Sequence, residues 1–497
     1  MSRFRFRCAK LAVCWLLFAA EWFGANLLAG ESARADEAPR PNVILLLLDD
    51  AGWKDTGRFG GRMRTPHLDR LADKGMRFTD CHSPAPNCSP SRAGILTGRI
   101  PARVGIYSYL PPDHPMHLRD QEITVAELAS RNGYRTGLFG KWHLSDLDND
   151  SQPGPGDQGF DYWFATSNNA SPSHRNPVNF VRNGEAVGEV SGYSCQIVVD
   201  EALAWLSSIG AGGGGGDEHS PFFACLWFHE PHTPIASPPE MVRGYQERYP
   251  GISPRRATYL ANLENVDDAI GRLLARLDAW GVADETVVWF TSDNGPLDAA
   301  SRGPLRGVKS NVWEGGHRVP GIVRWPARIA AGSECSVPVS GIDFLPTFCD
   351  LAGFDPPADR AIDGESQLPL WEGRESAFRR QVPLYWYFYR LNPALALRDG
   401  PWAIVADTDD AARPKAHPLL REDIPFVRSS RPVAFELYRL DRDLSQQRDL
   451  SGAEADELRR LRQKLERLHR EVTSEGVAWE IPAGYRDDAN RRVWDSR

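Results

Sequence analysis

The chain has 497 residues, of which 41% are apolar, enough for one large hydrophobic core and a smaller domain beside it. Its formal net charge is −8. There is no basic tract and no ladder of alternating basic and aromatic residues. These features argue against a nucleic-acid partner.

The N-terminus has the pattern of a signal peptide. Basic residues come first, an apolar run follows from Leu11 to Ala20, and small residues lead to Ala33-Arg34-Ala35. We expect a signal peptide over residues 1–35, cleaved after Ala35. A retained anchor helix is the alternative, but Glu21 interrupts the apolar run well short of a membrane span, and no later segment could cross a bilayer. The prediction is an exported protein, periplasmic or secreted, with no membrane span after cleavage.

Two apolar runs, over residues 42–48 and 286–292, end abruptly in oxygen-bearing side chains. Such runs are typical of central strands in a sheet covered on both faces. Asp49 and Asp50 follow the first run, and Asp293 and Asn294 follow the second. Ligands of open α/β sheets bind beyond the carboxyl ends of strands, and these hard oxygen donors favour Ca²⁺, with Mg²⁺ as a second choice, over zinc or copper. For Asp49-Asp50 alone, a surface turn remains an alternative.

Cys88 stands in the pattern Cys-x-Pro-x-Arg, with Arg92 as its last residue. We expect a helix over Ser91–Leu96, with Ser89 or Ser91 as its N-cap, so that Cys88 lies near the positive end of a helix. A buried or disulfide-bonded cysteine is the alternative interpretation.

Four further polar residues lie near predicted strand ends or in Gly-rich turns. Lys141 and His143 flank Trp142 and would project to one side of an extended segment. His232 follows the apolar run 221–228 in the pattern Pro-His-x-Pro, and Lys309 precedes Glu-Gly-Gly at residues 314–316.

Taken in order, these motifs resemble those of the sulfatase family from about Pro41 to Leu450, in particular the formylglycine-dependent type I sulfatases, the group of the arylsulfatases and N-acetylgalactosamine-6-sulfatases. The resemblance implies that a formylglycine-generating or equivalent maturation enzyme oxidises Cys88 to an aldehyde, whose hydrate is the nucleophile. It also implies a metal held by Asp49, Asp50, Asp293, Asn294 and an oxygen of the modified Cys88.

The resemblance assigns the remaining roles as follows. Lys141 and Lys309 would hold the sulfate oxygens, and Arg92 would orient the hydrate. His232 would protonate or steady the leaving oxygen, and His143 would help to remove the proton of the second hydroxyl so that sulfate is released. An unmodified Cys88 would then be nearly inactive. Ser145, where the family often has glycine, is a departure near the substrate mouth.

The family fold implies an alkaline-phosphatase-like α/β/α sandwich with a mostly parallel central sheet, over residues 36–375. A small C-terminal α+β domain with an antiparallel sheet is expected over residues 376–497. The segment 153–193 is expected to be loop-like and to shape the substrate mouth, with His174 and Arg175 as candidates for substrate contact. The apolar stripe from Ala257 to Trp280 predicts a core helix, and that of Leu458, Leu461, Leu465, Leu468 and Val472 predicts a helix packed on the small sheet.

Eight cysteines are present, and Cys8 and Cys14 would leave with the signal peptide. Conversion of Cys88 would leave five thiols, so at least one could not pair within the chain. None has the spacing of a structural zinc site.

The resemblance and the predicted export favour a sulfuric ester hydrolase acting on a sulfated carbohydrate or another sulfate ester. A hexosamine or galactose 6-sulfate in a polysaccharide is one such substrate. Two alternatives remain: a phosphonate or phosphodiester hydrolase of the same superfamily, and an exported glycan-binding protein that has lost the chemistry.

Overall fold

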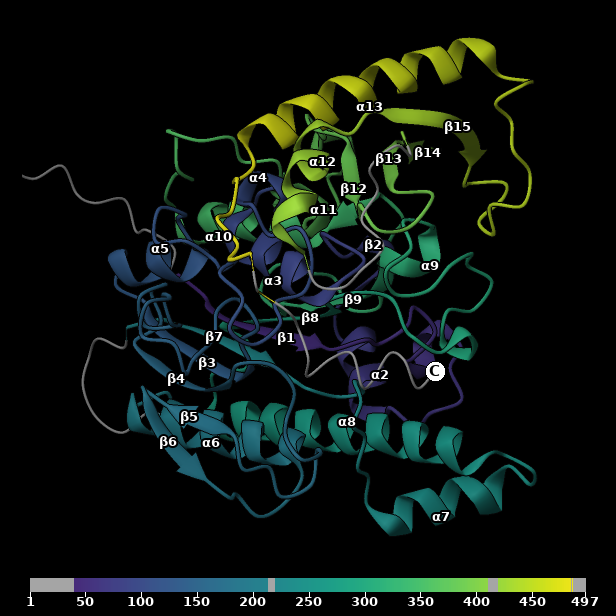
Figure 1. Ribbon diagram of the computed structural model, residues 1–497. Helices are drawn as coiled ribbons and strands as arrows, with labels where there is room; N and C mark the ends of the chain where they lie inside the picture. The colour runs from purple at the N-terminus through teal and green to yellow at the C-terminus, as the bar shows by residue number, and fades with distance from the viewer. Residues whose placement is uncertain (1–39, 213–219, 410–418, 484, 486–497) are drawn as a thin grey trace, which may run out of the picture. The chain divides into compact units, whose positions relative to one another are not determined.

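The computed structural model describes residues 40–212, 220–409, 419–483 and 485. The described residues from Pro41 onward form one compact unit (Figure 1). The predicted signal peptide lies outside the described residues. Among the residues described, no helix has the length and apolar character that crossing a bilayer requires.

A mixed β-sheet of eleven strands organises the larger part of the chain. Its strands are β1 (Asn42–Leu48), β2 (Met76–His82), β3 (Arg135–Lys141), β4 (Tyr162–Thr166), β5 (Phe180–Arg182), β6 (Glu185–Gly188), β7 (Phe222–Trp227), β8 (Thr286–Ser292), β9 (Arg318–Arg324), β10 (Ser333–Cys335) and β11 (Val339–Ser340). The order is β10-β2-β9-β8-β1-β7-β3-β4-β5-β6, with β11 also paired to β2.

The centre of this sheet, from β8 through β1, β7 and β3 to β4, is parallel throughout. Antiparallel pairs occur only toward its two sides, where β9 pairs with β8 and β2, and where β5 pairs with β4 and β6. The predicted mostly parallel α/β sheet is therefore confirmed. Since β8, β1, β3 and β4 run in one direction, their carboxyl ends meet at one edge.

Helices cover both faces of the sheet (Figure 1). The described helices of the whole chain, including those of its C-terminal part, are α2 (Pro66–Asp73), α3 (Cys88–Thr97), α4 (Pro101–Val104), α5 (Val125–Arg131), α6 (Ser194–Ser208), α7 (Pro239–Arg248), α8 (Pro254–Trp280), α9 (Glu314–His317), α10 (Phe344–Ala352), α11 (Leu368–Trp371), α12 (Ile424–Ser429) and α13 (Ala455–Glu475). Alternate residues of β1 enter opposite cores: Leu45 packs in the core that contains α3, α5 and α10, and Leu46 packs in the core that contains α6 and α8.

Two predictions about local structure need correction or adjustment. The segment 153–193 is not simply a loop, because it contains β4, β5 and β6. The aromatic residues of β4 form a strand by pairing in parallel with β3, a partner that the Gly- and Pro-rich local composition does not reveal. The core helix α8 begins three residues earlier than expected, where Ser253 caps it by accepting a hydrogen bond from the N–H of Arg256.

The C-terminal part contains a second, antiparallel sheet of four strands: β12 (Leu384–Tyr387), β13 (Leu395–Asp399), β14 (Trp402–Thr408) and β15 (Pro432–Arg439). As predicted, α13 packs on this sheet, with Leu461, Leu465 and Val472 buried. Leu395 and Leu461 belong to the same hydrophobic core as residues of α3 and α10. The predicted boundary between residues 375 and 376 therefore separates two sheets but not two cores, and independent domains remain a prediction.

A buried ion pair also joins the two sheets. Arg398 of β13 donates from Nη2 to Asp80 Oδ2 of β2 at 2.6 Å, and His82 Nε2 donates to the other oxygen of Asp80 at 2.7 Å. Burial raises the pKa of Asp80, but Arg398 and Arg318 outweigh this effect and hold that pKa far below its ordinary value. The strand that leads toward Cys88 thus depends on a cation from the C-terminal sheet.

We expect Arg398→Met to lower the free energy of unfolding by about 3–5 kcal/mol, because it leaves the buried Asp80 carboxylate short of a partner. Urea denaturation followed by tryptophan fluorescence measures the loss. Arg459→Met is the control, because Arg459 pairs with Asp456 on the exposed side of α13, where an ion pair contributes little. Equal denaturation midpoints for the two variants would contradict the role given to Arg398.

Candidate active site

The predicted site residues lie together at the carboxyl edge of the parallel strands. Asp49 and Asp50 follow β1, Lys141 ends β3, and Asp293 and Asn294 follow β8. Helix α3 brings Cys88 and Arg92, and loops bring His143, His232 and Lys309. All of these side chains are buried or nearly so. Residues far apart in the sequence therefore form one cluster.

Arg92 lies at the centre of the cluster, with an exposed fraction of 0%. Its Nε and Nη2 donate to Asp293 Oδ2 at 3.1 and 2.8 Å, and its Nη1 donates to the backbone oxygen of Lys141 at 2.7 Å. The guanidinium also lies 3.4 Å from Asp49 Oδ2 and over the ring of Trp227. One side chain thus connects α3 with the ends of β1, β3 and β8.

Cys88 is the first residue of α3, and Asn87 occupies the N-cap position without a side-chain hydrogen bond. The expected caps Ser89 and Ser91 are wrong because both hydroxyls serve other segments. Ser89 Oγ accepts from the N–H of Leu110 at 3.1 Å, and Ser91 Oγ bonds the backbone of Ala85.

The Cys88 thiol is 2% exposed, and its Sγ accepts a hydrogen bond from Lys309 Nζ at 3.2 Å. Burial raises the pKa of this thiol to about 11, although Lys141 and Lys309 act in the opposite direction. Every described cysteine is free of a disulfide bond, including Cys88, so the disulfide alternative does not apply here.

Three buried oxygen atoms in the cluster have no hydrogen-bond partner: Asp49 Oδ1, Asp50 Oδ2 and Asn294 Oδ1. Unpaired buried oxygens are costly, and a cation among them would remove that cost. Asp49, Asp50, Cys88 and His232 can each offer a ligand atom within 4.8 Å of the others. Asp293 differs, since its Oδ1 accepts from the N–H of Asp50 at 3.2 Å and its Oδ2 binds Arg92. The unpartnered carboxylate and amide oxygens of Asp49, Asp50 and Asn294 fit a hard cation.

Two lysines neutralise the paired carboxylates. Lys141 Nζ donates to Asp49 Oδ2 and, at 3.1 Å, to Asn169 Oδ1, while Lys309 Nζ donates to Asp50 Oδ1 at 2.6 Å. Burial raises the pKa of Asp49, yet Lys141, His232 and Arg92 together hold it well below its usual value. Burial and the neighbouring Asp49 raise the pKa of Asp293 to about 6. Three carboxylates thus face three cations: Arg92, Lys141 and Lys309.

The two predicted histidines have defined tautomers. His143 Nε2 donates to the backbone oxygen of Leu110 at 3.0 Å, and its buried Nδ1 has no partner. Burial, Lys141 and Arg92 place its pKa well below the ordinary value, so the ring is neutral and Nδ1 carries a lone pair. His232 Nδ1 donates to the backbone oxygen of Thr233 at 2.6 Å, which leaves Nε2 3.6 Å from Asp50 Oδ2. Burial lowers the pKa of His232 to about 4.

The backbone is strained at the same place. Asp50, His143 and Ser310, which follows Lys309, have positive φ angles of 68°, 58° and 71°. Such angles are uncommon for residues other than glycine and cluster at functional sites. The strain turns the chain sharply at the ends of β1 and β3, where the site side chains begin.

His174 and Arg175, the predicted substrate contacts, differ in their exposure to solvent. His174 is fully buried, where its Nδ1 accepts from Asn262 Nδ2 at 3.2 Å and lies 3.8 Å from Glu230. Arg175 is exposed, and its backbone bridges to Tyr193. Of the two, only Arg175 reaches the surface, and its contact with substrate remains a prediction.

Sequence reasoning missed two residues that contact the cluster. Asn169, which binds Lys141 Nζ, lies in the segment expected to be a loop, and no motif marks it. Trp227, under the Arg92 guanidinium, is the last residue of an apolar strand and resembles any core tryptophan. The position of Trp227 at the end of β7, beside the ends of β1 and β3, is the signal that could have identified it.

Comparison with known proteins gives consistent results. The family model described as Sulfatase matches residues 41–354. N-acetylgalactosamine-6-sulfatase of Sus scrofa is 34% identical over 421 residues, which cover 77% of this chain and 75% of that protein. Steryl-sulfatase of Rattus norvegicus is 32% identical over 436 residues, which cover 68% of this chain and 71% of that protein. The solved structure of Ps i-CgsB with k-i-k-neocarrahexaose matches with a TM-score of 0.74 and 24% identity, covers 92% of this chain and 97% of that chain, and shows the same fold.

We expect Arg92→Lys to lower the free energy of unfolding by about 3 kcal/mol, because lysine keeps the charge but cannot hold Asp293 and the Lys141 carbonyl together. Thermal and chemical denaturation measure this loss independently of activity.

Arg182→Lys is the matched control. Arg182 also binds a carboxylate, that of Glu201, with two of its nitrogens. Its side chain is 42% exposed, so the expected loss of unfolding free energy is smaller, about 1 kcal/mol or less. A loss at Arg92 no larger than the loss at Arg182 would contradict the central position assigned to Arg92.

Proposed function

We propose a specific reaction for this chain, which belongs to the sulfatase family and is a sulfuric ester hydrolase. It releases inorganic sulfate from a sulfated carbohydrate, using a nucleophile made from Cys88 and a divalent cation. The single observation that carries the proposal is the cluster around Cys88, in which Lys309 contacts the thiol while three buried oxygens lack partners.

The proposal includes conversion of Cys88 to formylglycine by a maturation enzyme. The hydrate of the aldehyde supplies an oxygen nucleophile. A bound cation, Ca²⁺ or alternatively Mg²⁺, would lower the pKa of that hydrate and offset charge on the sulfate oxygens. Asp49, Asp50, Asp293 and Asn294 would hold the cation, and the unpartnered oxygens of three of them support this assignment.

Lys141 and Lys309 bind the sulfate oxygens and stabilise the charge that develops during transfer. Their ammonium groups lie against Asp49 and Asp50, which hold them in place before substrate arrives. Arg92 neutralises Asp293 and Asp49 and orients the nucleophile from α3.

His143 and His232 take part in proton transfer. His143 accepts, on its Nδ1, the proton from the second hydroxyl of the hydrate formed at Cys88. This nitrogen has no partner, whereas Nε2 is bound to the backbone oxygen of Leu110. His232 presents Nε2, which steadies the leaving oxygen. Protonation of Nε2 is favoured once an anionic ester lies nearby, since a neighbouring negative charge raises a histidine pKa.

The substrate class and the location of the protein are part of the same proposal. The name of the Sus scrofa relative specifies the 6-sulfate of N-acetylgalactosamine, and Ps i-CgsB was solved with a carbohydrate. We propose a sulfated sugar in a larger glycan as the substrate, and export to the periplasm or the medium through the signal peptide of residues 1–35.

The first test combines peptide mass spectrometry around Cys88 with sulfate release from 4-nitrophenyl sulfate. The protein is produced together with a formylglycine-generating enzyme. We expect the Cys88 peptide to carry the aldehyde, and we expect Cys88→Ala to lose at least about 10³-fold in kcat, because the nucleophile is gone. Full activity with an unconverted thiol would overturn the mechanism. Faster release of phosphate from 4-nitrophenyl phosphate or a phosphonate ester would favour the phosphonate hydrolase instead.

The second test concerns the cation and uses thermal stability instead of activity. We expect saturating Ca²⁺, at about 100 times its Kd, to stabilise the wild-type protein by about 2.7 kcal/mol, because the ion binds only the folded state. Asp50→Asn should lose most of this gain.

Asp146→Asn, which changes a carboxylate outside the cluster, is the control and should keep the calcium-induced shift. A shift of equal size in Asp50→Asn and in the wild type would place the cation elsewhere.

A further inference from the structure

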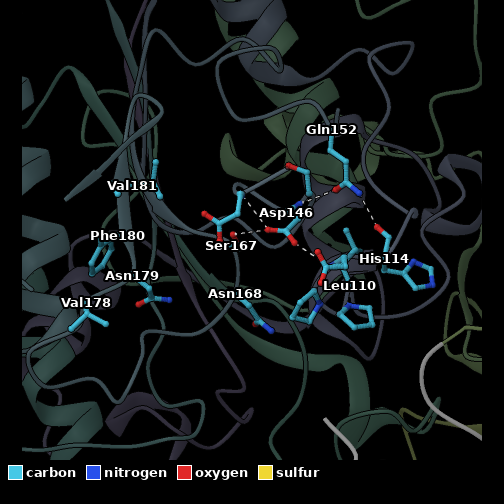
Figure 2. Close-up of a pocket in the computed structure, with 16 residues that line it drawn as sticks. Leu110, His114, Asp146, Gln152, Ser167, Asn168, Val178, Asn179, Phe180 and Val181 are labelled. Atoms are coloured by element: carbon cyan, nitrogen blue, oxygen red, sulfur yellow. Dashed lines mark hydrogen bonds between the residues drawn. The ribbon is translucent and has the colours of Figure 1, made fainter. Parts of the chain in front are cut away.

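A cavity of about 480 Å³ opens at the carboxyl edge of β3 and β4, where Leu110, Ser145 and Asn168 line it (Figure 2). The loop around Leu110 and His114 forms one part of its wall, and the loop after β3, from Ser145 to Gln152, forms another. The end of β4 and the segment 178–181 complete it. A volume of this size is typical of sites for small organic groups.

The cavity adjoins the active site through its own wall. The backbone oxygen of Leu110 accepts the hydrogen bond from His143 Nε2, and Ser145 lies two residues beyond His143. Ser145 is held by Trp142, whose Nε1 donates to its hydroxyl at 2.8 Å. Asn168, on the floor of the cavity, precedes the Asn169 that binds Lys141. The wall of the cavity thus binds His143 through Leu110 and is one residue away in sequence from a partner of Lys141.

Two opposite sides of the cavity differ in chemistry. Figure 2 shows Val178, Phe180 and Val181 on one side and Asp146 and Gln152 on the other. Val178 is 48% exposed, an unusual degree for a large apolar side chain in this protein. The first side also carries Asn179, whose amide is bound to the backbone of Ser171 and Asn169, and is otherwise apolar. Such a side, opposite one rich in hydrogen-bond acceptors, suits a sugar ring, which has a C–H face and hydroxyl groups at its edge.

The charge of the lining is entirely negative. Asp113, Asp146 and Asp148 contribute carboxylates, and no lysine or arginine is among the lining residues that the structure describes. Asp146 accepts from the backbone N–H groups of Asp113 and Asp148, at 3.0 and 3.2 Å, and so fixes the loops that carry the other two. The side chains of Asp113 and Asp148 are exposed and make no hydrogen bond or ion pair with the residues that the structure describes.

The remaining ionisable residue among the described lining residues is His114, and its hydrogen bonds are those of a neutral imidazole. Its Nδ1 accepts from the N–H of Met116 at 3.0 Å, and its Nε2 donates to the backbone oxygen of Leu419 at 2.9 Å. Among the described lining residues, carboxylates are the only charged groups that a ligand would meet, whereas the sulfate site carries three cations.

We propose that this cavity binds the sugar unit next to the sulfated one and selects an uncharged sugar over a uronate or a second sulfated unit. The inference rests on the proposed function, because it assumes that a sulfate ester occupies the site at Cys88. Hydroxyl groups can donate to Asp113 and Asp148, whereas a carboxylate in the cavity is repelled by both.

The test compares two disaccharides that contain the same 6-O-sulfated N-acetylhexosamine, one joined to galactose and the other joined through the same linkage to glucuronic acid. We expect kcat/KM for the galactose compound to exceed that for the glucuronate compound about tenfold at low salt, as like charges several ångströms apart near a surface predict. The ratio should fall at 0.5 M NaCl, since salt screens exposed charges. Both compounds are also measured as inhibitors of 4-nitrophenyl sulfate hydrolysis, which gives the ratio even where turnover is slow.

The double variant Asp113→Asn/Asp148→Asn should reduce the ratio at least threefold. The matched control, Asp284→Asn/Glu285→Gln, removes the same charge from exposed residues before β8, at the amino edge of the sheet, and should leave the ratio unchanged. A wild-type ratio near one, a preference for glucuronate, or equal ratios in the two double variants would overturn the inference.

Failure of the proposed function has a different signature, namely no sulfate release from any compound, 4-nitrophenyl sulfate included. In that case calorimetric titration of the protein with the same two disaccharides still decides the inference, because it measures their binding directly. Tighter binding of the galactose compound, lost in Asp113→Asn/Asp148→Asn, supports it, and equal binding overturns it.

Discussion

The buried guanidinium of Arg92 is the interaction on which the rest of the site depends. It binds Asp293 with two nitrogens, holds the carbonyl of Lys141 with a third, and rests on Trp227. Because these partners end β8, β3 and β7, one side chain of α3 sets the spacing of three strand ends. Only arginine combines a permanent charge with a planar fork of donors, so a lysine could not keep all of these partners.

The charges around Arg92 explain how an acidic protein can receive an anionic ester. Asp49, Asp50 and Asp293 would repel one another if they were alone, and Arg92, Lys141 and Lys309 offset that repulsion in a region almost without water. A divalent cation at the unpartnered oxygens would make the whole cluster positive. The surface beside it remains negative, as the lining of the neighbouring cavity shows. The protein thus separates a cationic site for sulfate from acidic surroundings over a short distance.

Much of this site could be predicted from local sequence, since an apolar strand that ends in Asp49-Asp50 or Asp293-Asn294 has one plausible placement in a parallel sheet. Helix α8 and the packing of α13 could also be predicted, because their apolar residues repeat with the period of a helix. Features that depend on distant partners could not be predicted. Ser89 and Ser91 are good N-cap residues, but Leu110 and Ala85 engage their hydroxyls. The strand β4 exists because β3 lies beside it, and neither Asn169 nor the burial of His174 has any local signal.

The burial of Cys88 has a consequence for the order of events during synthesis. A side chain that is 2% exposed, at the first residue of a buried helix, is out of reach of another protein's active site. Under the proposed function, the maturation enzyme must therefore act on an open chain, before α3 docks. The strand before Cys88 completes its charge balance only with Arg398, 318 positions after Asp80. The interval between translation of the cysteine and translation of the C-terminal sheet is thus a natural window for conversion, and a chain that folds too early would be trapped as the thiol.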